Sequence, residues 1–214
     1  MPEKTIKPKV LLFDIGGVVI NWDPQITYDY LKTLGIPEER AKLFFDDEAY
    51  NDFSRGKLTE QDFYEELKII LRAPDLSYEQ AVYAHSISMP GLVDGIKDLI
   101  QQLSENHKLA FVTDTEPWQD KHLESLIDLN QYPIFKSHEI GSLKAEGEFF
   151  LYVIRELGIE PKEALLIDDS SNKIEMAHQS GIETVLFSNV SELNADLERR
   201  SLLETESVSP RERK

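Results

Sequence analysis

The sequence predicts an α/β fold: a Rossmann-like, doubly wound parallel sheet with a helical cap inserted after its first strand. Two observations lead to this prediction. From residue 91 onward, short apolar runs alternate with helical segments, which is typical of parallel sheets covered by helices on both faces. Before this region, residues 21–89 carry apolar side chains at helical rather than alternating spacing, which predicts several short helices.

The first strand is predicted in the run LLFDIGGVVI, residues 11–20, where apolar residues surround a single carboxylate, Asp14. Charged groups are rare in such surroundings unless they have a partner or a function. The helical segment that follows is expected to hold about four helices. One should start at Thr59, which forms a capping pattern with Asp62, and the stretch LRAPDLSYEQ predicts a stop, a turn and a new helix start.

The second half of the chain is predicted to continue as alternating helices and strands. The expected helices cover residues 96–103, 118–129, 148–158 and 171–181, the last closed by Gly181. The expected strands cover residues 108–114, 134–137, 164–169 and 183–188. A further helix is expected from residue 191, and residues 204–214 are expected to form a flexible tail.

The composition excludes several classes of protein. A chain of 214 residues is long enough for one core domain with a smaller insertion. Because Cys is absent, disulfides, thiolate metal sites and cysteine nucleophiles are excluded. The formal charge of -17 argues against nucleic acid or an anionic membrane as a partner, and no apolar run reaches the roughly 18 residues of a membrane span. The first residues lack the apolar stretch of a secretory signal, so a cytoplasmic location is expected.

Three predicted strands end in acidic residues, namely Asp14, Asp114, and the pair Asp168 and Asp169. Because parallel strands end at the same edge of a sheet, these carboxylates are expected to converge there. Such a cluster repels itself unless a divalent cation lies within it, and oxygen ligands suit Mg²⁺. The alternative is that each aspartate only caps the helix or turn that follows it. Three strand ends with the same feature favour the metal site.

Four pieces of the sequence, in this order and at this spacing, resemble the haloacid dehalogenase (HAD) superfamily of hydrolases. They are LLFDIGGVVI, FVTDT, Lys144 within GSLKAEGEFF, and LLIDDSSNKIEMAHQSGIETV. The resemblance covers nearly the whole chain, and it implies a core formed by residues 1–20 and 90–203 with residues 21–89 as a helical cap. The first piece is similar to that of a subgroup that includes sugar-1-phosphate phosphatases.

The resemblance implies a phosphatase in which Asp14 attacks phosphorus and forms an aspartyl-phosphate. Asp14, the Gly16 carbonyl group and Asp169, joined by Asp168, would hold Mg²⁺. The phosphate would be surrounded by residues of the first three pieces, namely Gly16, Gly17, Thr113, Asp114 and Lys144.

Each of these phosphate-binding roles has a physical reason and an alternative. The Thr113 hydroxyl would donate to the phosphate, or would instead cap a helix. Lys144 would offset negative charge on the nucleophile and the phosphate, whereas a lone loop lysine would be solvated. Gly16 and Gly17 lack a Cβ atom, so the loop can turn sharply and its backbone groups can approach the ligand.

The sequence departs from the family pattern in ways that would weaken catalysis. Gly16 takes the position where most of these phosphatases carry a second aspartate, a general acid and base of the kind that contributes about 10²- to 10⁴-fold. Asp23 is the predicted substitute, although it would serve equally well as an N-cap before Pro24. Asp114 adds negative charge at a position where Asn is common, and Lys173 stands at another such position.

These observations favour a Mg²⁺-dependent phosphatase that acts on a small phosphorylated metabolite. A sugar 1-phosphate is a sensible substrate, because an anomeric oxygen leaves more easily than an ordinary alkoxide. Two alternatives stay open: a catalytically weak binding or regulatory protein, and a metal-independent haloacid dehalogenase, which the Asp168 and Asp169 pair disfavours. Selectivity is expected from residues near the site, with Trp22, Asp23, Phe53, Arg55 and Trp118 as candidates. The sequence does not indicate the oligomeric state.

Overall fold

Five parallel strands form the central sheet, in the order β5-β4-β1-β6-β7. The computed structural model describes residues 7–204. The strands are β1 (Val10–Asp14), β4 (Lys108–Thr113), β5 (Ile134–Lys136), β6 (Ala164–Asp168) and β7 (Glu183–Leu186). Because β1 lies in the centre, with β4 and β6 on either side, the chain crosses over the sheet in both directions from it. The predicted doubly wound α/β fold is therefore confirmed.

The register of the sheet aligns the carboxyl ends of the central strands. Phe13 of β1 lies beside Phe111 of β4 and beside Ile167 of β6. Every residue of β1 and of β6 is buried, as expected for unbroken apolar strands that are covered on both faces. One residue further along, Asp14 and Asp168 end these two adjacent strands. The two carboxylates therefore share one edge of the sheet.

Helices cover both faces of the sheet, and alternate residues of β1 face each of them. Leu11 and Phe13 pack against α7 and α12 on one face, while Val10 and Leu12 pack against α10 and α11 on the other. These helices are α7 (Ile96–Ser104), α10 (Glu148–Leu157), α11 (Ser171–Gln179) and α12 (Val190–Arg199). The remaining elements of this half are α8 (Pro117–Leu126), α9 (Ser137–Ile140) and the 3-10 helix η1 (Pro161–Glu163).

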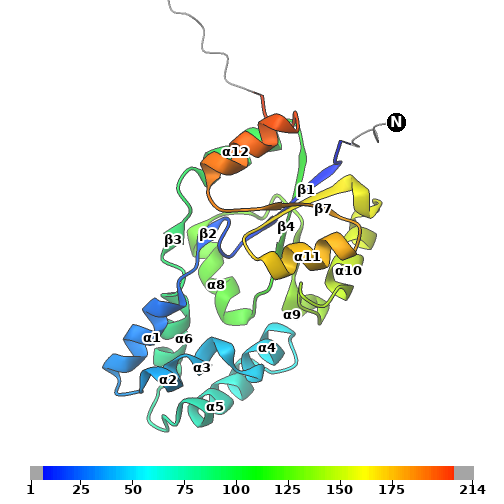
Figure 1. Cartoon of the computed structure of the whole chain (residues 1–214). Coiled ribbons are helices and arrows are strands. Elements are labelled where there is room, and N and C mark those ends of the chain that lie inside the picture. Colours follow the sequence, from blue (N-terminus) through cyan, green and yellow to red (C-terminus); the bar gives the residue numbers. More distant parts are fainter. Residues whose placement is uncertain (1–6, 205–214) are drawn as a thin grey trace, which may run out of the picture.

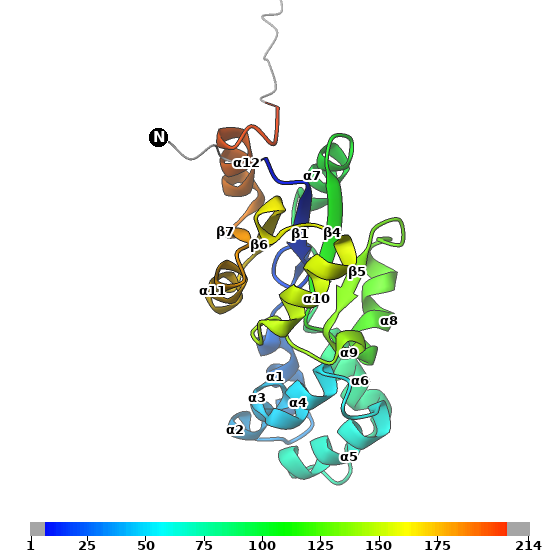
Figure 2. The same cartoon turned by 90° about the vertical axis from the view of Figure 1, so that its right-hand side faces the viewer.

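A helical segment leaves the sheet through β2 (Ile20–Asn21) and returns through β3 (Gly91–Leu92), which pair antiparallel. Its helices are α1 (Pro24–Thr33), α2 (Glu38–Ala41), α3 (Leu43–Asp46), α4 (Glu48–Ser54), α5 (Glu60–Leu71) and α6 (Tyr78–Ser86). The sequence predicted fewer helices, because Lys42 and Asp47 divide one helical stretch into the short α2, α3 and α4. Figures 1 and 2 show these six helices gathered at the end of the molecule opposite α12, next to α8 and α9.

The predicted helix starts in this segment are confirmed. Thr59 and Asp62 form a capping box at α5, and Ser77 forms a second capping box at the start of α6. Between them, α5 ends at Leu71, and its C-cap residue Arg72 adopts the left-handed conformation with φ 53°. The segment has an apolar core of its own, and Trp118 of α8 is part of that core. The helical segment therefore packs against the rest of the chain through α8.

The structure bears on the expectation about membranes but not on the one about the tail. Residues 205–214, which make up nearly all of the predicted flexible tail, lie outside the described residues. Between residues 7 and 204, no helix is both long enough and apolar enough to cross a membrane.

Candidate active site

A cavity of about 350 Å³ lies at the carboxyl ends of β1 and β4 and is bounded on its other side by the helical segment. The sheet, its loops and the helices α8 and α11 line it with Asp14, Gly16, Thr113, Asp114, Gln119, Leu143, Asp169, Ser170 and Lys173. The helical side lines it with Trp22, Phe45, Asp46, Tyr50, Asn51 and Ser54. The cavity is thus enclosed by two parts of the chain that are distant in sequence.

Asp14 ends the central strand and is almost completely buried, with 1% of its surface exposed. Its Oδ1 atom accepts the backbone N–H of Ile15 (2.7 Å) and lies 2.6 Å from the Nζ atom of Lys144. Its Oδ2 atom has no hydrogen-bond partner among the described residues. Burial acts to raise the pKa of this carboxyl group, but the nearby charges of Lys144 and Lys173 outweigh it, and the pKa is lowered. Asp14 is therefore an ionised carboxylate at the edge of a cavity.

Lys144 lies in the loop between α9 and α10, and its side chain is fully buried. Its ammonium group bridges Asp14 Oδ1 (2.6 Å) and Asp168 Oδ2 (2.7 Å). Its backbone N–H donates to Asp114 Oδ1 (2.8 Å). The alternative of a solvated loop lysine is wrong, because this buried ammonium group pairs with two buried carboxylates.

Asp14, Asp168 and Asp169 come together, as the strand ends predicted. Each offers a carboxylate oxygen within 4.8 Å of the others. Burial, followed by the charge of Asp14, raises the pKa of Asp168 to about 6 and also raises the pKa of Asp169. The residues fit a divalent cation, because the cluster repels itself, supplies only oxygen ligands, and leaves Asp14 Oδ2 buried without a partner.

Gly16 and Gly17 of the first loop differ in whether the position could hold a residue with a Cβ atom. Gly17 has φ +83°, and a Cβ atom at this position would collide with the carboxylate of Asp169. A Cβ atom on Gly16 would meet no other atom within 4 Å. The predicted need for a residue without Cβ therefore applies to Gly17 but not to Gly16.

Thr113 and Asp114 follow the end of β4 and both line the cavity. The Thr113 side chain is buried, and its hydroxyl donates only a long bond of 3.3 Å to the Asp114 carbonyl oxygen. The alternative that Thr113 caps a helix is wrong, because Glu116 is the N-cap of α8. Asp114 accepts from the backbone of Lys144 and lies 3.4 Å from Lys173 Nζ, so its charge already has partners.

The structure does not bring Asp23 to the cavity. Asp23 is exposed and caps α1, where its side chain accepts the backbone N–H of Gln25 (2.9 Å). Of the predicted selectivity candidates, Trp22 lines the cavity, whereas Phe53 and Trp118 belong to the buried core of the helical segment. No pattern in the sequence indicates the cavity residues of α3 and α4, because only the packing of the helices decides which side chains face the cavity.

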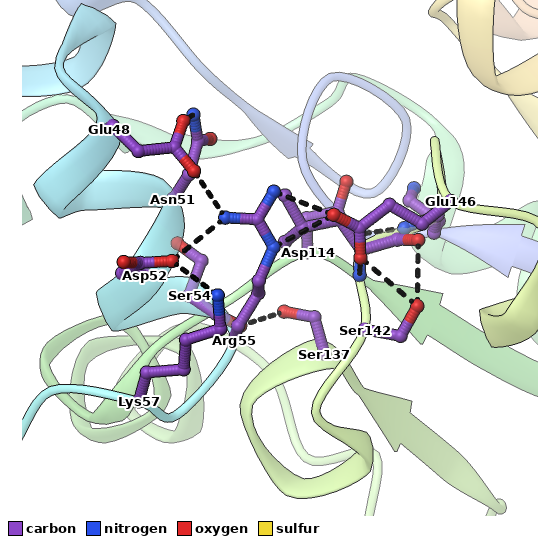
Figure 3. Close-up of polar contacts among 12 residues, drawn as sticks. Glu48, Asn51, Asp52, Ser54, Arg55, Lys57, Asp114, Ser137, Ser142 and Glu146 are labelled. Carbon is purple, nitrogen blue, oxygen red and sulfur yellow. Dashed lines mark hydrogen bonds and ion pairs between the residues drawn. The ribbon is translucent and has the colours of Figure 1, made fainter.

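Arg55, the remaining candidate, links the helical segment to the loop of Lys144 rather than lining the cavity. Figure 3 shows its guanidinium group between acidic residues of α4 and Glu146. It lies 2.8 Å from Glu48 and 3.0 Å from Asp52 through one nitrogen, and 2.6 Å from Glu146 through another. The second oxygen of Glu146 accepts the backbone N–H of Leu143 (2.9 Å). This network connects α4 to the segment that carries Lys144.

A second, buried link joins the two parts of the chain. His85 of α6 lies 2.7 Å from Glu116, which is the N-cap of α8, and both side chains are at most 1% exposed. The Tyr50 hydroxyl, at the cavity, lies 3.3 Å from the same His85 nitrogen. Burial, followed by the charge of Glu116, raises the pKa of Tyr50 well above its usual value, so the phenol stays protonated. The helical wall of the cavity is therefore held in place by polar contacts as well as by apolar packing.

The doubly wound sheet, with carboxylates gathered at its carboxyl edge and a helical insertion facing them, places the protein in the class of HAD-type hydrolases. A family model described as haloacid dehalogenase-like hydrolase matches residues 8–181. The match spans most of the chain, and the chain belongs to this family.

Curated proteins and a solved structure are similar to this chain. D-ribitol-5-phosphate phosphatase of Bacteroides thetaiotaomicron is 24% identical over 187 residues, which cover 82% of this chain and 90% of the relative. Drimenol cyclase drtB of Aspergillus calidoustus is 25% identical over 198 residues, but this chain spans only 36% of that longer protein. The solved structure of a HAD family enzyme from Bacteroides thetaiotaomicron, a complex with magnesium and inorganic phosphate, matches with a TM-score of 0.77 and 26% identity, covering 87% of this chain and 98% of the other.

Proposed function

We propose that this protein is a Mg²⁺-dependent phosphatase of a small phosphorylated metabolite and that Asp14 is its nucleophile. The observation that carries the proposal is the state of Asp14, an ionised and buried carboxylate that lines a cavity and is held by Lys144 through one oxygen only. The similarity to a phosphatase of a phosphorylated polyol, and to an enzyme in complex with magnesium and inorganic phosphate, supports the same conclusion.

The metal would be held by Asp14, Asp169 and the carbonyl oxygen of Gly16, with Asp168 beside them. When bound, Mg²⁺ supplies positive charge to the oxygens of the phosphoryl group. Lys144 offsets the repulsion between Asp168 and Asp14, because its ammonium group lies between their carboxylates. In this arrangement Asp14 remains ionised and fixed in direction before the substrate binds.

The reaction takes two steps. A carboxylate oxygen of Asp14 attacks phosphorus, the bond between phosphorus and the substrate oxygen breaks, and an aspartyl-phosphate forms as the alkoxide leaves and takes a proton from solvent. Water then attacks the phosphorus of this intermediate, its proton is lost to solvent, and orthophosphate leaves with Asp14 restored. The Thr113 hydroxyl, at the cavity wall, would donate to a phosphate oxygen in both steps.

The substrate is expected to be small and to have a good leaving group. A cavity of about 350 Å³ has room for a sugar or polyol phosphate, and its helical wall offers the aromatic rings of Trp22 and Tyr50 beside the polar side chains of Asn51 and Ser54. Because Gly16 supplies no acid, a leaving group that departs without help, such as the anomeric oxygen of a sugar 1-phosphate, suits the site. The helical segment would act as the cap that excludes water.

Release of orthophosphate from a panel of phosphorylated sugars, polyols and nucleotides tests the proposal, with Mg²⁺ and with a chelator. We expect Mg²⁺-dependent release from at least one sugar or polyol phosphate and no release from Asp14→Asn, which has the same shape but cannot attack phosphorus. Metal-independent halide release from a haloacid would instead assign a dehalogenase. Failure on both panels would assign a binding or regulatory role.

A further inference from the structure

Lys173, the third residue of α11, places an ammonium group between two carboxylates of the cavity. Its Nζ atom lies 3.4 Å from Asp114 Oδ2 and 3.8 Å from Asp14 Oδ2. Long side chains in the first turn of a helix point back toward its N-terminus, which here is the edge of the sheet. Both distances exceed the 2.7–2.9 Å of a strong charge-assisted hydrogen bond. The ammonium group is therefore attracted to both carboxylates without being fixed to either.

The other lysine of the site cannot meet an incoming anion in the same way. Lys144 is fully buried, does not line the cavity, and lies within 2.7 Å of both Asp14 and Asp168. Lys173 lines the cavity, and 25% of its side chain is exposed. Among the described residues that line this cavity, it is the only lysine or arginine.

The charges of the site show why a second ammonium group matters. Asp14, Asp114, Asp168 and Asp169 contribute four carboxyl groups, against the ammonium groups of Lys144 and Lys173. When a divalent cation is bound, these charges at the edge of the sheet balance, and Asp46 on the helical side adds one more carboxyl group to the cavity. Without Lys173 the site would stay negative, in a chain that already carries a formal charge of -17. A phosphate dianion would then be repelled both locally and at long range.

We propose that Lys173 binds the phosphoryl group of the substrate. On binding, its Nζ atom donates to a non-bridging phosphate oxygen, and Asp114 is the partner of Lys173 while the site holds no substrate. Asp114 suits this role, because the backbone N–H of Lys144 already fixes its other oxygen at 2.8 Å. The inference rests on the proposed phosphatase function. It also gives the negative charge of Asp114, which was expected from the sequence to weaken catalysis, a role in positioning Lys173 for the phosphate.

Inorganic orthophosphate is the probe, titrated by calorimetry into the full chain in the presence of Mg²⁺. Lys173→Met keeps the aliphatic stem and removes the charge. We expect it to weaken orthophosphate binding by about 10- to 100-fold, the usual effect of losing a hydrogen bond to a charged group, and to raise the KM of a phosphate ester to a similar extent. Lys173→Arg keeps the charge and should stay within about tenfold of the wild type. The matched control is Lys162→Met, which removes the same charge from a side chain that is 58% exposed and paired with Glu160.

The affinity for Mg²⁺, titrated without phosphate, separates a phosphate-binding role from a structural one. Removing a positive charge 3.8 Å from Asp14 should leave Mg²⁺ binding unchanged or make it tighter. If Lys173→Met loses its affinity for Mg²⁺ as well as its affinity for orthophosphate, Lys173 has a structural role and the inference is overturned. Unchanged orthophosphate binding in this variant would overturn it while the proposed function stands. A wild-type protein that binds Mg²⁺ but neither binds orthophosphate nor hydrolyses any ester would overturn both.

Discussion

Arg55 of the helical segment and Glu146 of the Lys144 loop form an ion pair, with 2.6 Å between a guanidinium nitrogen and a carboxylate oxygen. The two residues are 91 positions apart in sequence, and Arg55 also donates to Glu146 through Nε (2.8 Å). Because Glu146 accepts the backbone N–H of Leu143 as well, the pair connects the position of α4 to the loop that directs Lys144 toward Asp14. A contact outside the cavity thus couples the helical wall to the nucleophile.

Arg55→Met should lower kcat/KM by about tenfold while the fold is retained, because the Lys144 loop and α4 lose their direct link. Glu146→Gln should have a similar effect, and the double variant should lose little more than either single one. The coupling energy is expected to be about 1 kcal/mol, since part of the pair is exposed. The coupling energy is obtained from steady-state kinetics of the wild type, the two single variants and the double variant.

The control for this cycle is Arg155→Met, which breaks an ion pair to Glu156 in which both side chains are largely exposed. It should leave kcat/KM within about twofold of the wild type. Additive effects of Arg55→Met and Glu146→Gln would contradict the link, because independent residues give no coupling energy.

Lys144→Met should destabilise the protein strongly. The ammonium group pairs with two carboxylates that are each no more than 2% exposed, so its removal leaves buried charges without a partner. A loss of about 3–5 kcal/mol is expected when one partner of a buried ion pair is removed. Urea unfolding in the presence of a chelator measures it. A protonated carboxyl group of Asp14 or Asp168 needs no cation. The loss in the free energy of unfolding should therefore become smaller as the pH is lowered from 7 toward 5.

The comparison for Lys144→Met is Lys121→Met, in which a side chain that is 69% exposed loses its pair with Glu60. This change should alter the free energy of unfolding by less than about 0.5 kcal/mol. Equal losses in the two variants would mean that the bridge between Asp14 and Asp168 does not stabilise the fold.

Residues at strand ends could be predicted from the sequence, because one rule of sheet geometry fixes where they lie. Asp14, Asp168 and Asp169 each follow an apolar run, and parallel strands bring such ends together. The spacing of apolar residues separately predicted the alternation of helices and strands from residue 91 onward, so a parallel sheet covered by helices could be predicted from local patterns.

The helical side of the site could not be predicted in this way. Tyr50 and Asn51 face the cavity only because α4 packs against α5 and α9 at one particular angle, and their spacing in the sequence does not encode that packing. Asp23 is a predicted site residue only because it is close in sequence to the first loop. In the structure a local hydrogen bond to Gln25 at the start of α1 uses its side chain instead.

Gly17→Ala should damage the site, whereas Gly16→Ala should be tolerated. An added Cβ atom at Gly17 would collide with the Asp169 carboxylate, and the alanine would have to adopt φ +83°, which is strained for a residue with a Cβ atom. A Cβ atom at Gly16 would meet no other atom within 4 Å. We expect Gly17→Ala to lose at least 1 kcal/mol of stability and to weaken Mg²⁺ binding by displacing Asp169. Thermal unfolding of Gly17→Ala and Gly16→Ala, with and without Mg²⁺, measures their stability and their response to the metal. If both variants keep the wild-type response to Mg²⁺, Gly17 does not hold Asp169 in place.

Gly16→Asp should raise the turnover of substrates with poor leaving groups. The structure leaves room for a side chain at this position, and Gly16 lines the cavity next to Asp14. A carboxyl group there could protonate the leaving oxygen and then activate water, a contribution of about 10²-fold or more in general acid–base catalysis. The gain should be large for a primary-alcohol phosphate and small for a sugar 1-phosphate, because the anomeric oxygen needs little help.

Gly16→Asn, which has the same size but cannot transfer a proton, should show no gain. If the Asp and Asn variants have equal kcat on both substrates, the missing proton donor does not limit the reaction, and the slow step must lie elsewhere, in substrate positioning or product release.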